Sequence, residues 1–323
     1  MPRRPLLAAI ALAAMLTAPA SALAQGYPER PVRLMLAFSA GGTLDVLARL
    51  VANKLTGLWG QSVVVENRPG SAGLIGSTAA AAADPDGYTL HLGAQSLAVN
   101  VTLQPAAKLD PVKDFEPIML VATAQDLLIV GMQSPFKTVH ELIEHAKANP
   151  GKLTYGTNNI GTSSHLSMTS FMNATGINVR MVPYTQSSQM VADVIGGRVD
   201  MQFPTSGGHV GNVKAGKVRA LAVSGPDRAK LLPDVPTLRE LGIVFEDESS
   251  WYALLAPRGT PKEIVEKINR DMETVLADPE LRARTDTLGF RLIGGSPDRL
   301  REHMKSEVAK WAGVARTPAF LGK

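Results

Sequence analysis

The stretch Leu34-Met-Leu-Ala-Phe-Ser-Ala-Gly-Gly-Thr-Leu-Asp45 places two glycines between an apolar run and a second, helix-like run. The apolar residues predict a β-strand over Val32–Phe38, and the residues after the glycines predict a helix over Thr43–Leu58. Glycine adopts backbone conformations that other residues avoid, and the first N–H groups of a helix have no partner within it. The turn is therefore a candidate anion-binding site, although a simple βα turn with Thr43 as helix N-cap has the same pattern.

Short apolar runs alternate with longer helical runs along the rest of the chain, which predicts an α/β fold. Further strands are expected at Ser62–Glu66, Tyr88–Gly93, Leu127–Gly131, Leu153–Gly156, Val179–Val182, Val199–Phe203, Val218–Ser224 and Ser250–Pro257. Further helices are expected at Gly73–Ala83, Thr138–Ala148, about Ser164–Thr175, Ser188–Ile195, Pro261–Ala277 and Pro297–Ala312. Short loops between them favour parallel strands. The pattern restarts in mid-chain, and about 300 mature residues are enough for two lobes.

The N-terminus has the three parts of a cleavable secretory signal. These are the basic segment Met1-Pro-Arg-Arg-Pro5, the apolar run Leu6–Leu16 and the small residues Ala22-Leu-Ala24. The apolar run is shorter than the roughly 20 residues that span a bilayer, and no later run is long and apolar enough either. We therefore expect residues 1–24 to be removed, leaving a soluble exported chain that starts near Gln25.

Composition and charge exclude several classes of protein. The chain has no Cys, which excludes disulfides, thiol catalysis, Cys-bound metals and a lipid attached to a Cys at the cleavage site. The formal net charge is +4, and removal of Arg3 and Arg4, the charged side chains of residues 1–24, leaves +2. Basic residues are scattered and aromatic residues make up only 5% of the chain, so no nucleic-acid partner is expected.

A second polar loop, Gly156-Thr-Asn-Asn-Ile-Gly-Thr-Ser-Ser-His165, also follows a predicted strand and opens a predicted helix. In open α/β sheets ligands bind beyond the carboxyl ends of the strands, so one such loop in each lobe predicts a cleft between the lobes. Neither loop contains Arg or Lys. A carboxylate would be held reversibly by backbone N–H groups and hydroxyls. The alternative is a well-capped helix after a flexible loop.

Three further segments lie where a ligand could reach them. The glycine-rich turn Glu66–Gly76 lacks both the Lys-Ser/Thr of a P-loop and the Rossmann spacing, so we interpret it as a tight βα turn with secondary ligand donors. Tyr184 and Thr205 each follow a predicted strand. Tyr184 could equally be a half-buried packing residue.

His165 stands beside Ser163 and Ser164, which raises a serine hydrolase as an alternative. Adjacent residues at a helix start point in different directions, and no Gly-x-Ser-x-Gly elbow occurs. We therefore interpret His165 as a capping or packing residue. The six His residues lack the spacing of metal ligands, so neither a metal nor another cofactor is expected.

Ten motifs occur in order from the mature start onward. They are Tyr27-Pro28, Phe38-x-x-Gly-Gly-x-x-Asp45, Val64-Val-Glu-Asn-Arg-Pro-Gly70, Pro85-Asp-Gly-Tyr-Thr-Leu90, Pro111-x-Lys-Asp-Phe115, Gly161-Thr-Ser-x-His-Leu166, Val182-Pro-Tyr184, Gly196-Gly-x-Val-Asp200, Leu232-Pro-Asp-Val-Pro-Thr237 and Ala256-Pro-x-Gly-Thr-Pro261. The set resembles the Bug-type (Bordetella uptake gene) solute-binding proteins, the periplasmic components of tripartite tricarboxylate transporters.

The resemblance implies a two-lobed periplasmic-binding-protein fold, a type II-like Venus flytrap with a hinge and a small carboxylate in the interlobe cleft. We place the chain crossings near Thr123–Asp126 and Glu246–Ser249. Lobe 1 would then comprise residues 25–125 and 247–323, and lobe 2 residues 126–246. The family pattern implies ligand contacts at Gly42, Thr43, Asp45, Gln95, Thr162 and Ser163. The loops themselves add Phe38, Ser39, Gly41, Thr157, Asn158, Tyr184 and Thr205.

The chain departs from the family pattern in four ligand-facing places. Ser39-Ala40 replaces Pro-Pro, Asn158-Asn159-Ile160 replaces a Ser-Gly-Asn run, Thr185-Gln186 replaces Lys-Gly, and Pro204 replaces a frequent Asp. The loss of a lysine and of an acid changes the electrostatics of the cleft. The resemblance therefore implies a carboxylate without identifying it.

The expected function is that of a monomeric, non-enzymatic solute-binding protein that captures a small carboxylate. Its expected partners are that ligand and the membrane subunits of a tripartite tricarboxylate-type transporter. A ligand-binding partner of a membrane signalling system is a second reading, and the serine hydrolase is a third.

Overall fold

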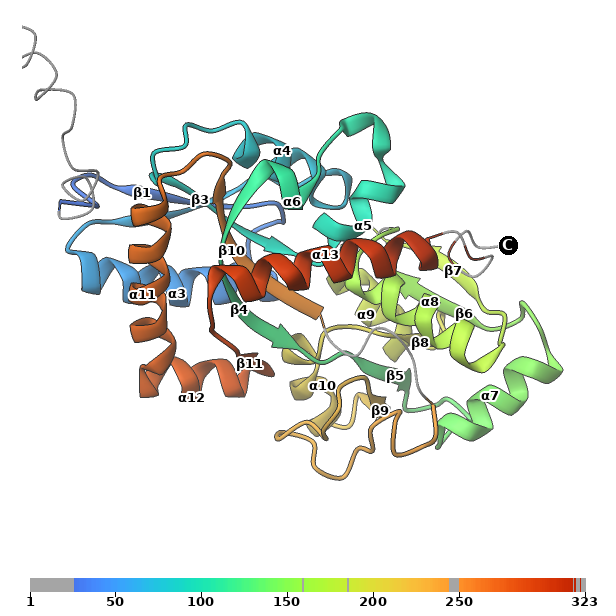
Figure 1. Cartoon of the computed structure of the whole chain (residues 1–323). Coiled ribbons are helices and arrows are strands. Elements are labelled where there is room, and N and C mark those ends of the chain that lie inside the picture. Colours follow the sequence, from blue (N-terminus) through green and yellow to red (C-terminus); the bar gives the residue numbers. More distant parts are fainter. Residues whose placement is uncertain are drawn as a thin grey trace, which may run out of the picture.

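Two β-sheets, each flanked by helices, form two lobes that lie side by side (Figure 1). This computed structural model describes residues 26–158, 160–184, 186–243, 250–315, 317 and 320. The expected signal segment and the expected crossing at Glu246–Ser249 lie outside the described residues. The prediction of a two-lobed α/β fold is confirmed.

The first lobe is built on a six-stranded sheet. Its strands are β1 (Val32–Leu36), β2 (Val63–Asn67), β3 (Thr89–Ala94), β4 (Phe115–Ala124), β10 (Ser250–Pro257) and β11 (Phe290–Leu292), in the order β11-β4-β10-β3-β1-β2. Its helices are α3 (Thr43–Trp59), α4 (Leu74–Ala81), α5 (Ser96–Leu103), α6 (Pro111–Asp114), α11 (Lys262–Ala277), α12 (Pro279–Thr287) and α13 (Pro297–Val314), with short 3-10 turns η1 (Ser71–Gly73) and η2 (Pro105–Ala107).

The second lobe is built on a five-stranded sheet. Its strands are β5 (Leu127–Gly131), β6 (Thr154–Thr157), β7 (Arg180–Pro183), β8 (Met201–Gln202) and β9 (Val218–Val223), in the order β7-β6-β8-β5-β9. Its helices are α7 (Val139–Ala148), α8 (Ser163–Thr175), α9 (Ser187–Ile195) and α10 (Val210–Lys214), with the 3-10 turn η3 (Ser206–Gly208).

Both sheets contain parallel and antiparallel strands, whereas the short loops of the sequence predict parallel strands alone. β1, β2 and β3 are parallel, but β10 runs antiparallel to β3 and β4, and β5 runs antiparallel to β8 and β9. The reason is the connection between the lobes. β4 leads out of the first sheet and β10 returns to it, and strands that leave and enter one lobe from the same side must run in opposite directions.

The chain crosses from the first sheet to the second at Gln125–Asp126, between β4 and β5. Asp126 is fully buried there. The Ser167 hydroxyl donates to Asp126 Oδ2 at 2.5 Å, and the Asp126 backbone N–H donates to Ser224 Oγ at 2.9 Å. Ser250 Oγ, at the start of β10, lies 3.4 Å from both carboxylate oxygens. One buried carboxylate thus links the outgoing strand to the returning one.

Both faces of each sheet are covered, and this explains the apolar strands that the sequence shows. β5 and β10 are buried at every position, as expected for strands packed on both faces. On the first sheet, α3 and α11 pack on one face and the buried Trp311 of α13 packs on the other. Gly76 brings α4 directly onto β1, because a Cβ there would lie 2.7 Å from the Cα of Ala37.

The structure departs from the predicted elements in a few places. β4, β11, α5, α6, α10 and α12 were not expected, and β8 is shorter than the expected Val199–Phe203. α11 starts one residue later than expected, because the Thr260 hydroxyl donates to the Pro257 carbonyl at 2.8 Å and does not cap the helix. α13 starts as expected, since Ser296 accepts a hydrogen bond from the Arg299 N–H.

Candidate functional site

A cleft of about 700 Å³ lies between the two lobes and is lined by the loops that follow β1, β3, β6 and β8. Eleven of the thirteen residues expected to contact a ligand line it: Phe38, Ser39, Gly41, Gly42, Thr43, Asp45, Gln95, Asn158, Thr162, Ser163 and Thr205. Residues far apart in the sequence therefore meet in one cavity, with contributions from both lobes.

The double-glycine turn ends with an uncapped helix. Gly41 has φ +80°, a left-handed conformation that favours glycine. The N-cap of α3 is Gly42, and no side chain caps the helix. The reading of Thr43 as N-cap is therefore wrong, because Thr43 is the first helical residue. The free N–H groups of the first turn remain available to an anion.

The side chain of Asp45 stabilises this turn by hydrogen bonds. Its carboxylate is almost fully buried and accepts hydrogen bonds from the Gly41 N–H at 2.9 Å, from Arg49 Nε at 2.9 Å and from Asn67 Nδ2 at 3.0 Å. Burial favours the neutral acid, but the bonds from Arg49, Gly41 and Asn67 outweigh it and lower the pKa of Asp45 below its usual value. Asp45 lines the cleft, yet its oxygens are occupied by these partners.

The second polar loop has the same design. Gly161 has φ +85°, and the N-cap of α8, Thr162, makes no side-chain capping bond. Ser163 Oγ lies 3.5 Å from Thr205 Oγ1, so hydroxyls from two loops meet at the cleft. Thr157 does not line the cleft. It is fully buried behind the loop, where its hydroxyl lies 2.9 Å from Ser164 Oγ.

Tyr184 is also absent from the described lining of the cleft. Its hydroxyl donates to Asp193 Oδ2 at 2.7 Å, and burial together with that carboxylate raises the pKa of Tyr184 to about 12. Asp193 in turn pairs with Arg198. The packing alternative describes Tyr184 better than a direct ligand contact does, because its polar group is already satisfied.

His165 packs and caps, as the sequence predicted. It is 1% exposed, its Nδ1 accepts from the Gly161 N–H at 3.4 Å, and its ring meets Phe320 edge-on at 4.8 Å. Burial lowers the pKa of His165 to about 4. Among the described residues no hydrogen bond joins His165 to Ser163 or Ser164, so these groups do not form a base and nucleophile pair.

Helix N-termini dominate the electrostatics of the cleft. The N-cap residues of α3, α4, α5, α8 and α9 line it, and none of these helices has a side-chain cap: Gly42, Gly73, Gln95, Thr162 and Gln186. Away from the cleft, α7, α12 and α13 are capped by Thr138, Asp278 and Ser296, whereas α11 has no side-chain cap. No Lys or Arg occurs among the described lining residues. The positive potential therefore comes from the backbone.

The glycine-rich turn contributes more than the sequence indicated. Gly70, Ser71, Ala72 and Gly73 all line the cleft and all have positive φ, at 134°, 48°, 51° and 90°. For Ser71 and Ala72 this conformation costs about 1–3 kcal/mol each, and such strain is typical of functional sites. Packing against the rest of the protein holds Ser71 and Ala72 in this conformation. The short pattern Gly-Ser-Ala-Gly therefore does not predict their positive φ.

Two cleft residues with buried polar atoms, Gln202 and His209, were missed by sequence reasoning. Gln202, the last residue of β8, is 1% exposed, and its Oε1 has no hydrogen-bond partner among the described residues. His209 Nδ1 is likewise buried without a partner there, and burial lowers the pKa of His209 to about 4. The available signal was a Gln between two apolar residues, Met201 and Phe203, at the end of a predicted strand.

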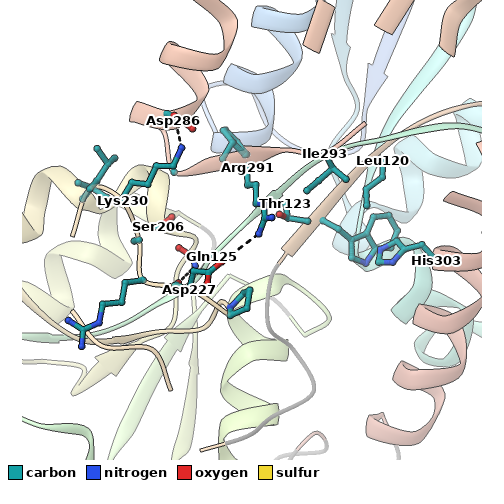
Figure 2. A pocket seen from close by; sticks show the side chains of 18 of the residues that line it. Leu120, Thr123, Gln125, Ser206, Asp227, Lys230, Asp286, Arg291, Ile293 and His303 are labelled. Atoms are coloured by element: carbon teal, nitrogen blue, oxygen red, sulfur yellow. Dashed lines mark hydrogen bonds and ion pairs between the residues drawn. The ribbon is translucent and has the colours of Figure 1, made fainter. Parts of the chain in front are cut away.

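A larger cavity of about 950 Å³ lies elsewhere between the lobes and is lined by β4, α12, α13 and residues 226–231 (Figure 2). Lys230 pairs with Asp286 at 2.9 Å, and Arg291 pairs with Asp227 at 3.8 Å. Both ion pairs join the two lobes. We favour the smaller cleft as the site because the helix starts that line it have no side-chain caps, whereas these two cations already have partners.

No group of three or more His, Asp or Glu side chains within the described ranges is arranged to hold a metal ion. None of the described helices combines the length and the apolar character needed to cross a membrane.

Comparisons with known proteins agree on one family. The family model described as tripartite tricarboxylate transporter family receptor, TctC, matches residues 47–317. Protein BugT of Bordetella pertussis (strain Tohama I) is 34% identical over 303 residues, which cover 93% of this chain and 92% of BugT. The solved structure of R. palustris Rpa4515 with adipate is 35% identical with a TM-score of 0.83, covering 90% of this chain and 97% of its own. The solved structure of MatC from Rhodopseudomonas palustris with bound malate is 29% identical with a TM-score of 0.81. The match covers 90% of this chain and 100% of the MatC chain.

Proposed function

The chain belongs to the tripartite tricarboxylate transporter receptor family, and on that premise we propose that it captures a small carboxylate in the periplasm for a transporter of this type. The ligand would sit in the cleft between the lobes. The membrane subunits of the transporter would receive it from the ligand-bound form. The adipate and malate bound to two structural neighbours support a carboxylate as the ligand class.

The observation that carries this proposal is the convergence of uncapped helix N-termini on a cleft whose described lining has no Lys or Arg. Backbone N–H groups at a helix start attract an anion through both hydrogen bonds and the helix dipole. Each such bond to a carboxylate contributes about 1.5–3 kcal/mol. Several of them suffice for tight binding that is still reversible, which suits a receptor that must release its cargo.

We propose that the lobes close on the ligand by rotation about the crossing at Asp126. The proposed lobes are residues 25–125 with 247–323, and residues 126–246. This division is supported by the sheet order, since β4 and β10 belong to one sheet and β5 and β9 to the other. Gly207 lies at a contact between the two proposed lobes. A Cβ on it would lie 1.9 Å from the Leu288 carbonyl oxygen, so the two backbones touch across the lobes.

We also propose that the protein acts without catalysis. A serine nucleophile needs a base within hydrogen-bond reach, and the described contacts of His165 are to Gly161 and Phe320. Hydrolysis of a generic ester such as 4-nitrophenyl acetate is expected to be equal for the wild type and Ser163→Ala. A clear loss of turnover in the variant would contradict this part of the proposal.

Calorimetry of the mature chain with a panel of mono-, di- and tricarboxylates tests the main function. At least one acid should bind, and native mass spectrometry of protein purified from periplasm should show a bound small acid. The carboxamide analogue of the best acid is the matched control, and we expect it to bind at least about tenfold more weakly because it lacks the charge. If no acid binds and none co-purifies, the proposal fails.

A further inference from the structure

Gln202 is a buried amide in the second lobe's wall of the cleft. It lies on β8, the strand between β6 and β5, and pairs with Gly156 and Ile129. Its neighbours in sequence, Met201 and Phe203, are apolar and fully buried. The side chain of Gln202 is 1% exposed and lines the cleft. The amide thus lies between two buried apolar side chains, at the end of β8 that lines the cleft.

The carbonyl oxygen of this amide lacks a donor. Oε1 has no hydrogen-bond partner in the part of the chain that the structure describes. A buried acceptor in this state is unfavourable, because it has lost its water without gaining a protein bond. Buried polar atoms in native proteins are nearly always satisfied, so the exceptions need a physical reason. In a ligand cleft, a group on the ligand provides one.

The missing partner must be a donor, which restricts its chemistry. An ionised carboxylate only accepts hydrogen bonds, so it would repel the Gln202 oxygen. An ammonium group donates, but it favours a nearby anion. The only carboxylate among the described lining residues is that of Asp45, which is already bound by Arg49 and Asn67. A hydroxyl donates and carries no charge, so it fits best.

His209 supports the same conclusion. Its Nδ1 is buried and has no partner within the described residues, and the residue lines the same cleft. Burial lowers the pKa of His209 to about 4, so the imidazole is neutral near pH 7. This part of the cleft therefore offers neutral hydrogen-bonding groups, suited to a hydroxyl.

We propose that the ligand is a hydroxycarboxylate, whose carboxylate binds the helix N-termini and whose hydroxyl donates to Gln202 Oε1. This inference rests on the proposed function, because it requires a carboxylate in the cleft. It adds a ligand class and names a residue that selects for it. Acids of the same length without the hydroxyl would leave the amide oxygen unsatisfied and would bind more weakly.

The test compares acids in matched pairs by calorimetry: malate with succinate, lactate with propionate, and 3-hydroxybutyrate with butyrate. In each pair that binds, the wild type should prefer the hydroxy acid by about tenfold or more. Gln202→Leu should remove this preference and bind the unsubstituted acid as well as or better than the wild type. Gln61→Leu, the same change in a turn outside the cleft, should keep the preference.

The outcomes separate this inference from the proposed function. Equal wild-type affinity for both members of the pairs would overturn the inference and indicate that water satisfies Gln202, while the proposed function would stand. A preference that persists in folded Gln202→Leu would also overturn it. If that variant does not fold, Gln202→Met serves in its place, and the wild-type comparison is decisive by itself. Failure of every carboxylate to bind would remove the proposed function as well.

Discussion

The two cavities between the lobes obtain their polarity from different groups. The cleft is lined by helix N-termini, hydroxyls and an amide, with no Lys or Arg among the described lining residues. The larger cavity is lined by Lys and Arg side chains, and two of them pair across the lobes, Lys230 with Asp286 and Arg291 with Asp227 (Figure 2). Two cations of the charged cavity, Lys230 and Arg291, therefore already have partners on the opposite lobe.

The difference shows how a protein can separate lobe contact from ligand capture. An exposed ion pair is nearly neutral in free energy, so it can form or break as the lobes move. A helix start keeps unsatisfied donors that gain strongly only when an anion arrives. A cation in the cleft would attract any anion and would need a partner when the cleft is empty. Backbone donors avoid that requirement.

The largest effect is expected from a permanent carboxylate in the cleft. Ser163→Asp places one at the first residue of α8, where it occupies the anion position itself. We expect ligand affinity to fall at least about a hundredfold, while the stability of the ligand-free protein stays equal or rises because an acid suits a helix N-terminus. Calorimetry and thermal unfolding measure both. Ser62→Asp, outside the cleft, should change neither, and normal binding by Ser163→Asp would contradict the site.

Unfolding at acidic pH tests whether His209 stays uncharged in the folded protein. His209 has a folded pKa of about 4 and an ordinary value of 6.5, so between these values the unfolded chain binds the proton and the folded chain does not. Stability is therefore full above pH 6.5 and decreases as the pH falls toward 4, by roughly 2–3 kcal/mol from this residue. Urea unfolding of the ligand-free protein at several pH values measures the decrease.

His209→Gln should reduce this loss of stability, whereas His140→Gln, at an exposed position on α7, should leave it unchanged. An identical pH profile for wild type and His209→Gln would show that His209 does not stay neutral in the fold.

A smaller effect is expected where the lobes touch at Gly207. Gly207→Ala places a Cβ 1.9 Å from the Leu288 carbonyl oxygen, which prevents full closure. Affinity should fall about tenfold, because binding must then push against this contact. X-ray scattering should show less compaction on ligand addition. Gly211→Ala is the matched control, since nothing lies within 4 Å of a Cβ there, and equal compaction in both variants would disprove the closure contact.

The smallest effect is expected in the charged cavity. Lys230→Met removes the pair with Asp286, whose two side chains are 79% and 48% exposed. Exposed pairs of this kind contribute about 0–1 kcal/mol, so affinity should change less than about threefold. A double-mutant cycle with Asp286→Asn, read by calorimetry, measures the coupling. A tenfold effect on binding would mean that this cavity takes part in ligand capture.

The sequence predicted what depends on neighbours along the chain. The strand, glycine turn and helix around Gly41 were expected within a residue or two at most boundaries, because apolar periodicity and turn chemistry are local. Gly161 and the loop before α8 were recognised for the same reason. Both loops line one cleft, as the position of βα loops at strand ends predicts.

What the sequence did not predict depends on contacts distant in the chain. Tyr184 follows a strand as the cleft residues do, but its hydroxyl is taken by Asp193. Asp45 stands in the ligand turn but is neutralised by Arg49. Gln202 differs from its apolar neighbours only by an amide, and its importance appears when β8 is found in the centre of the second sheet. The sequence pattern can place such residues near a site, but only the tertiary structure shows which groups each side chain contacts.

The uncapped helix starts have an evolutionary consequence. A backbone N–H is present whatever residue the codon specifies, proline excepted, so a point mutation seldom removes the grip on a carboxylate. The side chains that line the cleft, such as that of Gln202, differ in this respect because a single codon change replaces them. A gene duplication would thus yield a receptor that still holds acids, while one or two substitutions redirect it to a new nutrient.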